Sequence, residues 1–98
     1  MLVKIYKASR MIVAICDSDL IGKKFEQGKM QIDLTGNFFK GDEKTAEEVK
    51  KIIEDAERED ACFNLVGVKS VEIAKKCGVV GDGGIVEIDG VAVALVLM

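Results

Sequence analysis

The chain of 98 residues contains no histidine and no proline, and it has only one tyrosine and four phenylalanines. Without histidine, a single chain cannot form a Ser–His or Cys–His nucleophile pair or a metal site that requires a histidine ligand. With so few aromatic side chains, valine, isoleucine, leucine and alanine must fill most of the core, which suits a domain that contains β-strands. The composition therefore excludes several catalytic chemistries before any motif is considered.

Long apolar runs and paired cysteines are also missing. The longest apolar run, Val91 to Met98, has eight residues, whereas a membrane helix needs about twenty. Residues 1–7 have too short an apolar stretch for a signal peptide, so we expect a soluble cytoplasmic protein. The three cysteines, Cys16, Cys62 and Cys77, are far apart. They fit small buried hydrophobes in a reducing compartment better than a disulfide framework, a zinc site or a reactive thiol.

The chain does have the apolar content of one globular domain, which we expect to span residues 1–98. Apolar residues make up 49% and charged residues 32% of the sequence. The net charge of −3 is divided unevenly, with a balance of +2 over residues 1–44 and −5 over residues 45–98. Because nucleic-acid-binding domains are usually basic, this chain could offer only a local basic face built from its first half.

Short runs rich in isoleucine and valine predict strands in the first part of the chain. Residues 2–7 and 11–16 predict a β-hairpin, and the second of these runs is apolar at both alternations, so both its faces should be covered. Asp17 is a good N-cap for a single helical turn that Gly22 would end. The charged residues that follow, up to Lys29, predict only a connection.

The later strands have clearer signals. Residues 30–35 alternate between apolar and polar side chains, which predicts a half-buried strand, whereas residues 38–42 resemble a loop. Asp89-Gly90 separates two β-type runs, 85–88 and 91–98, and this pattern predicts a type I′ hairpin. The final run has no polar residue on either face, so it should lie in the middle of the sheet.

Capping signals predict two helices. Thr45 and Glu48 form a capping box, and the helix that begins there should run from about Ala46 to Glu59. Its apolar stripe consists of Val49, Ile52, Ile53 and Ala56. Asn64 is a good N-cap for a second helix of about thirteen residues, which would end at Gly78.

In that second helix we expect Val68, Val71 and Ala74 to pack inward, with Lys69 and Ser70 outside. The resulting order is β-β-β-α-α-β-β. It predicts an α+β fold, with a mixed or antiparallel sheet of about five strands and two helices covering one face.

The segment Gly67-Val68-Lys69-Ser70 superficially resembles the end of a phosphate-binding P-loop. That motif needs a glycine directly before the lysine, where this chain has Val68, and another glycine five positions before that one. Counted from Gly67 instead, the position five residues earlier is Cys62 and not a glycine. We therefore reject a nucleotide triphosphatase. The free N–H groups at the start of the second helix could still hold an anion such as a phosphate.

Three kinds of function stay open. A non-enzymatic module that binds RNA or a ribonucleoprotein would use basic residues and the helix start, and its candidate residues are Arg10, Lys23, Lys24, Asn64 and Lys69. A small carboxylate-based enzyme or anion-binding protein would use Asp17, Asp19, Asp82 and Asp89. Each of these four aspartates already has a role at a cap or turn. A scaffold could self-associate through an exposed strand edge. No motif indicates a cofactor, a metal or a catalytic residue.

Several segments together resemble a known family. They include Val13-Ala14-Ile15-Cys16-Asp17, then Leu20-Ile21-Gly22-Lys23-Lys24-Phe25, and Cys62-Phe63-Asn64-Leu65-Val66-Gly67. With Val3 to Tyr6, Ser70 to Ala74 and Gly78 to Val80, the chain resembles a small archaeal family of similar length that is catalogued as a conserved domain of unknown function. The resemblance covers essentially the whole chain. It implies an archaeal cytoplasmic protein associated with RNA or translation, and it supplies no catalytic residues.

Overall fold

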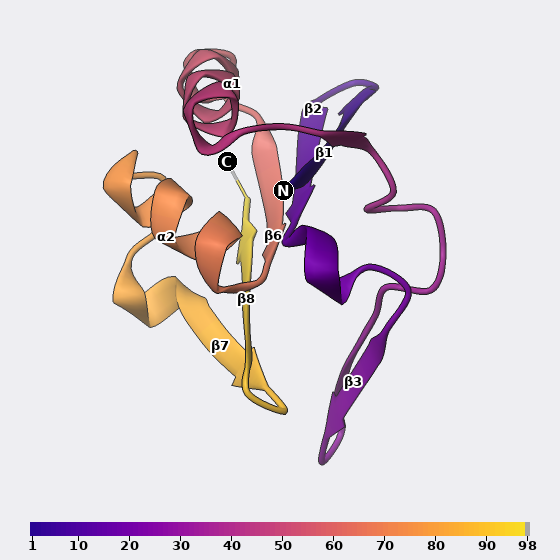
Figure 1. Ribbon diagram of the computed structural model, residues 1–98. Coiled ribbons are helices and arrows are strands. Elements are labelled where there is room, and N and C mark those ends of the chain that lie inside the picture. The colour runs from indigo at the N-terminus through magenta and orange to yellow at the C-terminus, as the bar shows by residue number, and fades with distance from the viewer. Residues whose placement is uncertain (98) are drawn as a thin grey trace.

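The computed structural model describes residues 1–97 and contains a six-stranded sheet, a separate two-stranded hairpin and two helices (Figure 1). The strand order of the large sheet is β5-β1-β2-β6-β8-β7. Its strands are β1 Leu2–Lys7, β2 Met11–Cys16, β5 Asp42–Glu43, β6 Cys62–Val66, β7 Ile85–Ile88 and β8 Val91–Val96. The hairpin pairs β3 Lys24–Gln27 with β4 Met30–Asp33. The helices are α1 Ala46–Arg58 and α2 Val68–Lys76, and two short 3-10 turns, η1 Ser18–Leu20 and η2 Asp82–Gly84, complete the chain.

The large sheet is mixed, as one of the two predicted alternatives stated. Strands β2 and β6 run parallel, and every other neighbouring pair is antiparallel. Strand β8 lies between β6 and β7, so its expected position inside the sheet is confirmed. The expected strand extended to Met98, which lies outside the described residues. The Asp89-Gly90 turn is also confirmed, because both residues have positive φ, 51° and 80°, as a type I′ turn requires.

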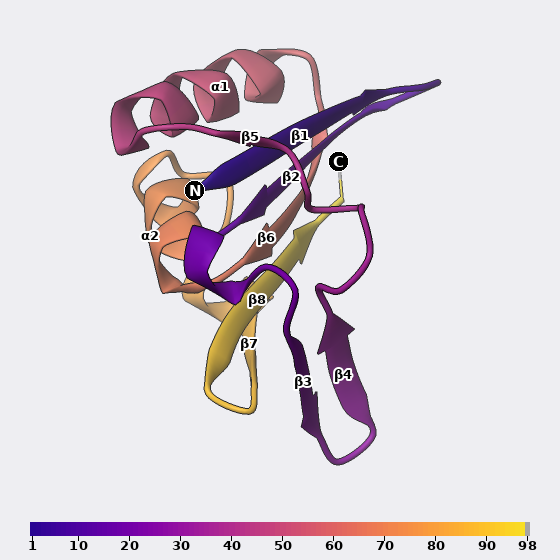
Figure 2. The same cartoon turned by 45° about the vertical axis from the view of Figure 1, so that its right-hand side comes forward.

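Both helices cover the same face of the sheet, as the sequence predicted (Figures 1 and 2). The capping box of α1 is present: the backbone N–H of Glu48 donates to Thr45 Oγ1, and the N–H of Thr45 donates to the Glu48 carboxylate. The predicted stripe places Val49 and Ile53 in the core cluster that also contains the fully buried Phe63 of β6. Burying one such side chain contributes about 1.5–3 kcal/mol, so this layer supplies much of the stability.

The opposite face of the sheet is only partly covered. Leu34 and Phe39, from the segment that follows β4, pack on Cys16 and Val66. This second cluster explains why residues 13–16 of β2 are buried on both faces, as their apolar alternation predicted. None of the helices among residues 1–97 is long and apolar enough to cross a membrane.

The predicted start of the second helix was wrong. Residues 62–66 form strand β6, and Asn64 is its central residue rather than an N-cap. Helix α2 begins at Val68, which is exposed, while Ser70 is completely buried. A short apolar run fits a buried strand and a helix equally well, and the parallel pairing of β6 with β2 decides between them.

Two further strands were missed, so the predicted element order was incomplete. Strand β3 falls where we expected a connection, and the two-residue β5 falls in the expected loop region. In β3 only Phe25 is partly buried, so its sequence has no clear apolar alternation. Strand β5 exists through its pairing with β1, which is a long-range contact that local patterns do not encode.

Candidate functional site

The carboxylate of Asp17 occupies the N-terminus of helix α2. The backbone N–H of Lys69 donates to Asp17 Oδ2 at 3.0 Å, and the N–H of Ser70 donates to Oδ1 at 2.9 Å. The Ser70 hydroxyl donates to the same Oδ1 at 2.7 Å. Asp17 is only 4% exposed. These contacts fill the position where a helix start would hold an external phosphate.

The parallel strands bring Asp17 to this position. Asp17 directly follows β2, and its N–H donates to the carbonyl of Val66, the last residue of β6, at 2.9 Å. The chain turns from β6 into α2 at Gly67, whose φ of +105° is accessible mainly to glycine. A Cβ atom there would clash with the Asp17 carboxylate. Gly67 therefore serves the close approach of the carboxylate, and it does not form part of a phosphate loop.

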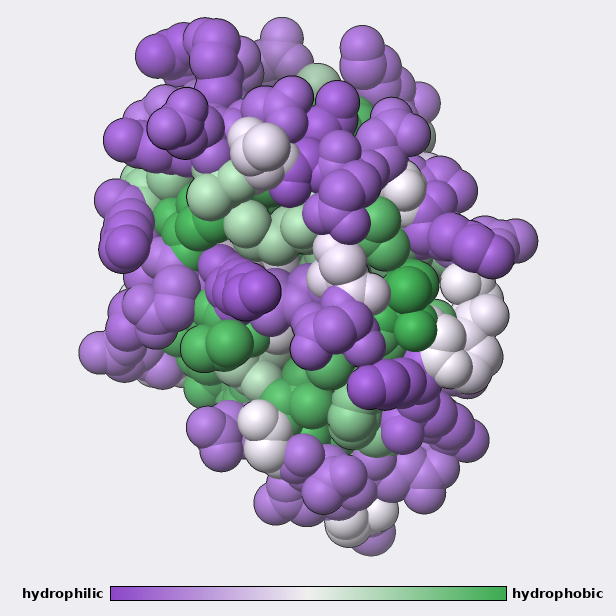
Figure 3. Space-filling model, viewed as in Figure 1, coloured by the Kyte–Doolittle hydropathy of each residue, from purple (hydrophilic) through white to green (hydrophobic). Residues whose placement is uncertain are grey.

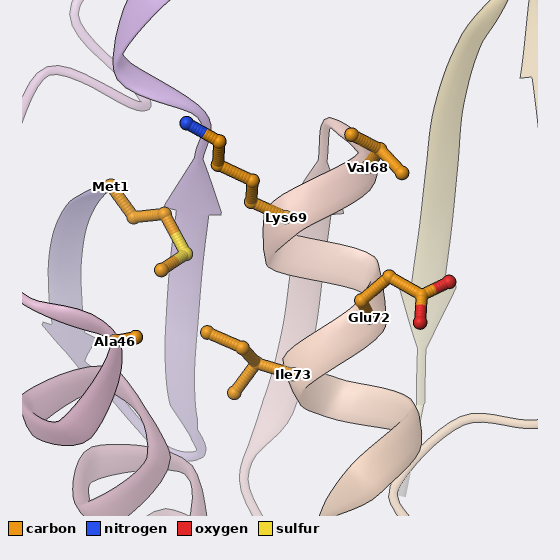
Figure 4. Close-up of a pocket in the computed structure, with 6 residues that line it drawn as sticks. All are labelled: Met1, Ala46, Val68, Lys69, Glu72 and Ile73. Carbon is orange, nitrogen blue, oxygen red and sulfur yellow. The ribbon is translucent and has the colours of Figure 1, made fainter.

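The sequence-predicted site residues do not form one surface. Arg10 lies in the β1–β2 turn, and Lys23 and Lys24 lie at the start of the hairpin, where Lys24 pairs with Glu26 at 3.1 Å. Figure 2 shows that the β1–β2 turn, the hairpin and α2 occupy three separate parts of the molecule. Lys69 is on the first turn of α2, and its side chain extends toward the end of β2 (Figure 4). The half-buried Asn64 pairs with Ala14 and Leu95 within the sheet.

A different set of lysines meets at the β1 edge of the sheet. Lys4, Lys40 and Lys44 line one depression of about 510 Å³ together with Asp42. Among residues 1–97 none of these three lysines forms an ion pair with a carboxylate. One signal for this cluster is visible in the sequence, namely the positive charge balance of residues 1–44. No local pattern indicates that residues so distant along the chain would meet, because their proximity depends on the β1–β5 pairing.

Aromatic rings adjoin these lysines. The rings of Tyr6 and Phe38 stack with centroids 5.0 Å apart and planes at 11°, and the Tyr6 hydroxyl donates to the Phe38 carbonyl at 2.7 Å. Lys4 Nζ lies 5.4 Å from the centre of the Tyr6 ring and donates to the Asn37 carbonyl at 3.2 Å. The Phe38 side chain is 43% exposed. We call Lys4, Tyr6, Phe38, Lys40 and Lys44 the β1-edge surface.

A second, mostly apolar groove separates the two helices. Its first part, about 270 Å³, lies between Met1, Ala46 and Ile73, with Lys69 and Glu72 at its rim (Figure 4). An adjoining depression of about 250 Å³ shares Ala46 and Ile73. Three charged residues, Glu47, Lys50 and Lys76, also line the adjoining depression. On the face shown in Figure 3, hydrophilic residues separate the apolar patches.

The ionisable groups show structural roles. The terminal ammonium and the Ser18 hydroxyl bind Glu43 and hold the pKa of its carboxyl below the usual value. An ion pair with Lys75 at 2.7 Å likewise lowers the pKa of Asp82. Burial raises the pKa of the Cys16 thiol to about 11. Within residues 1–97 no three cysteine or carboxylate side chains gather as a metal site would require.

Comparisons with known proteins agree with this fold. A family model described as "Protein of unknown function (DUF424)" matches residues 6–98. The crystal structure of an uncharacterized conserved protein from Methanopyrus kandleri superposes with a TM-score of 0.81 and 20% sequence identity, covering 99% of this chain and 92% of that chain. At this identity the likeness shows a shared fold and nothing about activity. The comparison with curated proteins finds no match.

Proposed function

The chain belongs to the DUF424 family, as the resemblance of its segments predicted, and on that premise we propose that it is a non-enzymatic module that binds single-stranded RNA. The observation that carries this proposal is the β1-edge surface, where three lysines without carboxylate partners among residues 1–97 adjoin an exposed aromatic ring. Its members are Lys4, Tyr6, Phe38, Lys40 and Lys44. The proposal includes a cytoplasmic location, because the protein would encounter such an RNA there.

The chemistry of this surface suits a single strand better than a duplex. Lysine side chains contact phosphates without regard to sequence, and an aromatic ring stacks on an unpaired base, with about 1–3 kcal/mol lost when such a ring is truncated. Phe38 is the ring available for stacking on a base, because its side chain is exposed. The Tyr6 ring is already in contact with the Phe38 ring and with Lys4. The acidic second half of the chain restricts binding to this local surface, since it repels the rest of a polyanion.

The test is fluorescence anisotropy with a labelled single-stranded oligouridine over a range of salt concentrations. Three phosphate contacts predict that log K falls with log salt at a slope of about −2. Lys40→Glu/Lys44→Glu should abolish binding, and Phe38→Ala should weaken it roughly ten-fold or more through lost stacking. Lys50→Glu/Lys51→Glu, which makes the same charge change on the exposed side of α1, is the matched control and should bind more strongly than the β1-edge variant.

The sequence-predicted residues enter the same experiment. Lys23→Glu/Lys24→Glu tests whether the hairpin contributes to RNA binding, and Arg10→Glu and Lys69→Glu test the other two positively charged sites. Retention of RNA no stronger than that of a neutral control protein at low salt would refute the proposal. Equal losses in the β1-edge variant and the α1 control would show an effect of net charge instead of a site.

A further inference from the structure

The two edges of the six-stranded sheet differ in how they are protected. At one edge, the two-residue strand β5 pairs with part of β1, and Lys4, Lys40 and Lys44 lie beside it. Short strands and lysines are devices that keep sheet edges from pairing with other chains. At the other edge, β7 contains neither lysine nor proline, and its register with β8 continues without a bulge from Ile85 to Ile88. The outer backbone of β7 is therefore open.

Exposed apolar side chains continue inward from this open edge. Val86 is 50% exposed on β7, and Leu95 and Leu97 are 58% and 73% exposed beside it. The register pairs Val86 with Val93, so alternation places Val86, Leu95 and Leu97 on the same face of the sheet. The hairpin covers only the turn end of this face, where the N–H of Asp89 donates to the Gln27 side chain at 2.7 Å. Apolar patches of this kind mark interaction sites.

The charged residues in and around β7 are acidic. Residues 77–97 include Asp82, Glu87 and Asp89 and have no lysine or arginine. Lys75 neutralises Asp82, whereas neither Glu87 nor Asp89 has an ion-pair partner among the described residues. Glu87 also lines a hollow of about 210 Å³ that it shares with Asp19. A strand that pairs with β7 would meet unpaired carboxylates.

We propose that β7 is a docking edge for an extended segment of another protein in which basic and apolar residues alternate. Such a segment adds one more strand to the sheet through main-chain hydrogen bonds. An apolar side chain of the segment lies beside Val86, and a basic side chain lies opposite Glu87. A second copy fits poorly, because pairing two β7 strands brings together two acidic segments without a single basic residue.

The test uses a synthetic nonapeptide of alternating lysine and valine or threonine as the probe, titrated into the ¹⁵N-labelled chain. We expect chemical-shift changes and slower amide exchange in residues 85–88. Glu87→Lys should weaken peptide binding about five-fold, as cross-strand charge pairs predict, whereas Glu59→Lys on the exposed end of α1 should leave it unchanged. Val86→Lys, which adds the missing protective lysine to the edge, should remove binding while the spectrum shows an intact fold.

Each other outcome overturns the proposal. A peptide with glutamate in place of lysine that binds equally well removes the charge argument. Shift changes located on the β1-edge surface, or no shift changes at millimolar peptide, would show that β7 is not a docking edge. Light scattering that shows a dimer abolished by Val86→Lys assigns the edge to a second copy of the chain. The RNA proposal is independent of these results, because its residues lie at the opposite edge of the sheet.

Discussion

Replacing Asp17 by alanine should destabilise the protein strongly, although Asp17 is one side chain in a connection between two elements. The substitution removes one carboxylate that accepts hydrogen bonds from two backbone N–H groups of α2 and from the Ser70 hydroxyl. Ser70 is fully buried, so its hydroxyl loses the hydrogen-bond partner that the structure gives it. The helix start also loses a negative charge near its positive dipole end.

The magnitude follows from these contacts. Hydrogen bonds to a charged group contribute about 1.5–3 kcal/mol, and a buried donor left without a partner costs about 1–3 kcal/mol. We therefore expect Asp17→Ala to lower the free energy of unfolding by about 3–5 kcal/mol, a large part of the roughly 5–15 kcal/mol typical of a domain. Asp17→Asn keeps an oxygen for Ser70 and loses the acceptor for the Lys69 N–H, so it should cost about 1–2 kcal/mol.

Urea unfolding followed by far-ultraviolet circular dichroism measures the loss, and the midpoint for Asp17→Ala should fall by about 2 M. Asp19→Ala is the matched control, because Asp19 is the same residue type two positions along and is exposed. Added phosphate should partly restore Asp17→Ala and leave the native chain unaffected, since it can bind the vacated N–H groups.

A double-mutant cycle with Ser70→Ala gives the coupling directly, and the two losses should be far from additive. If Asp17→Ala and Asp19→Ala differ in unfolding free energy by less than about 0.5 kcal/mol, a typical surface effect, Asp17 does not hold α2 in place. Additive losses would show that Asp17 and Ser70 act separately.

Three further predictions concern other parts of the fold. Gly67→Ala should lose at least about 3 kcal/mol in urea unfolding, since its positive φ costs about 1–3 kcal/mol and its Cβ meets a carboxylate; near-native stability would contradict this. The hydrogen bond from the Thr45 N–H lowers the pKa of Glu48, so its stabilisation is present above the unfolded pKa and is lost as pH falls through the folded pKa. Glu48→Gln should therefore reduce stability at neutral pH and have little effect in strong acid, and an equal loss at both would refute the linkage. Cys16, whose burial raises its pKa to about 11, should react with iodoacetamide only on unfolding, whereas the half-buried Cys62 reacts earlier; mass spectrometry of the alkylated chain distinguishes the two orders.

Helix α1 shows where local sequence suffices. Its capping box, its apolar stripe and its exposed charged face are all encoded within about four turns of chain, and all appear in the structure. The Asp89-Gly90 hairpin is similar, because the turn requires positive φ at both residues and few other pairs adopt it. These elements form wherever the rest of the chain places them.

Asp17 shows where local sequence fails. It has the residue type of an N-cap and it does cap a helix, but the helix is α2, whose capped N–H groups lie 52 and 53 positions along the chain. Asn64 is the opposite case, because it has the residue type of a helix cap but lies within strand β6 and caps no helix. A capping residue identifies the kind of contact it makes, and only the pairing of β2 with β6 determines which helix receives it.

The sequence by itself determined the fold class, the first helix, the hairpins at both ends and the absence of histidine-based chemistry. The tertiary structure alone decided that β6 is a strand, that Asp17 fills the start of α2, and that Lys4, Lys40 and Lys44 meet beside exposed aromatic rings. One physical cause separates the features that the sequence predicts from those that only the tertiary structure decides. Periodicity and capping act over a few residues, whereas strand pairing and the surfaces it creates depend on contacts between residues that the chain separates by dozens of positions.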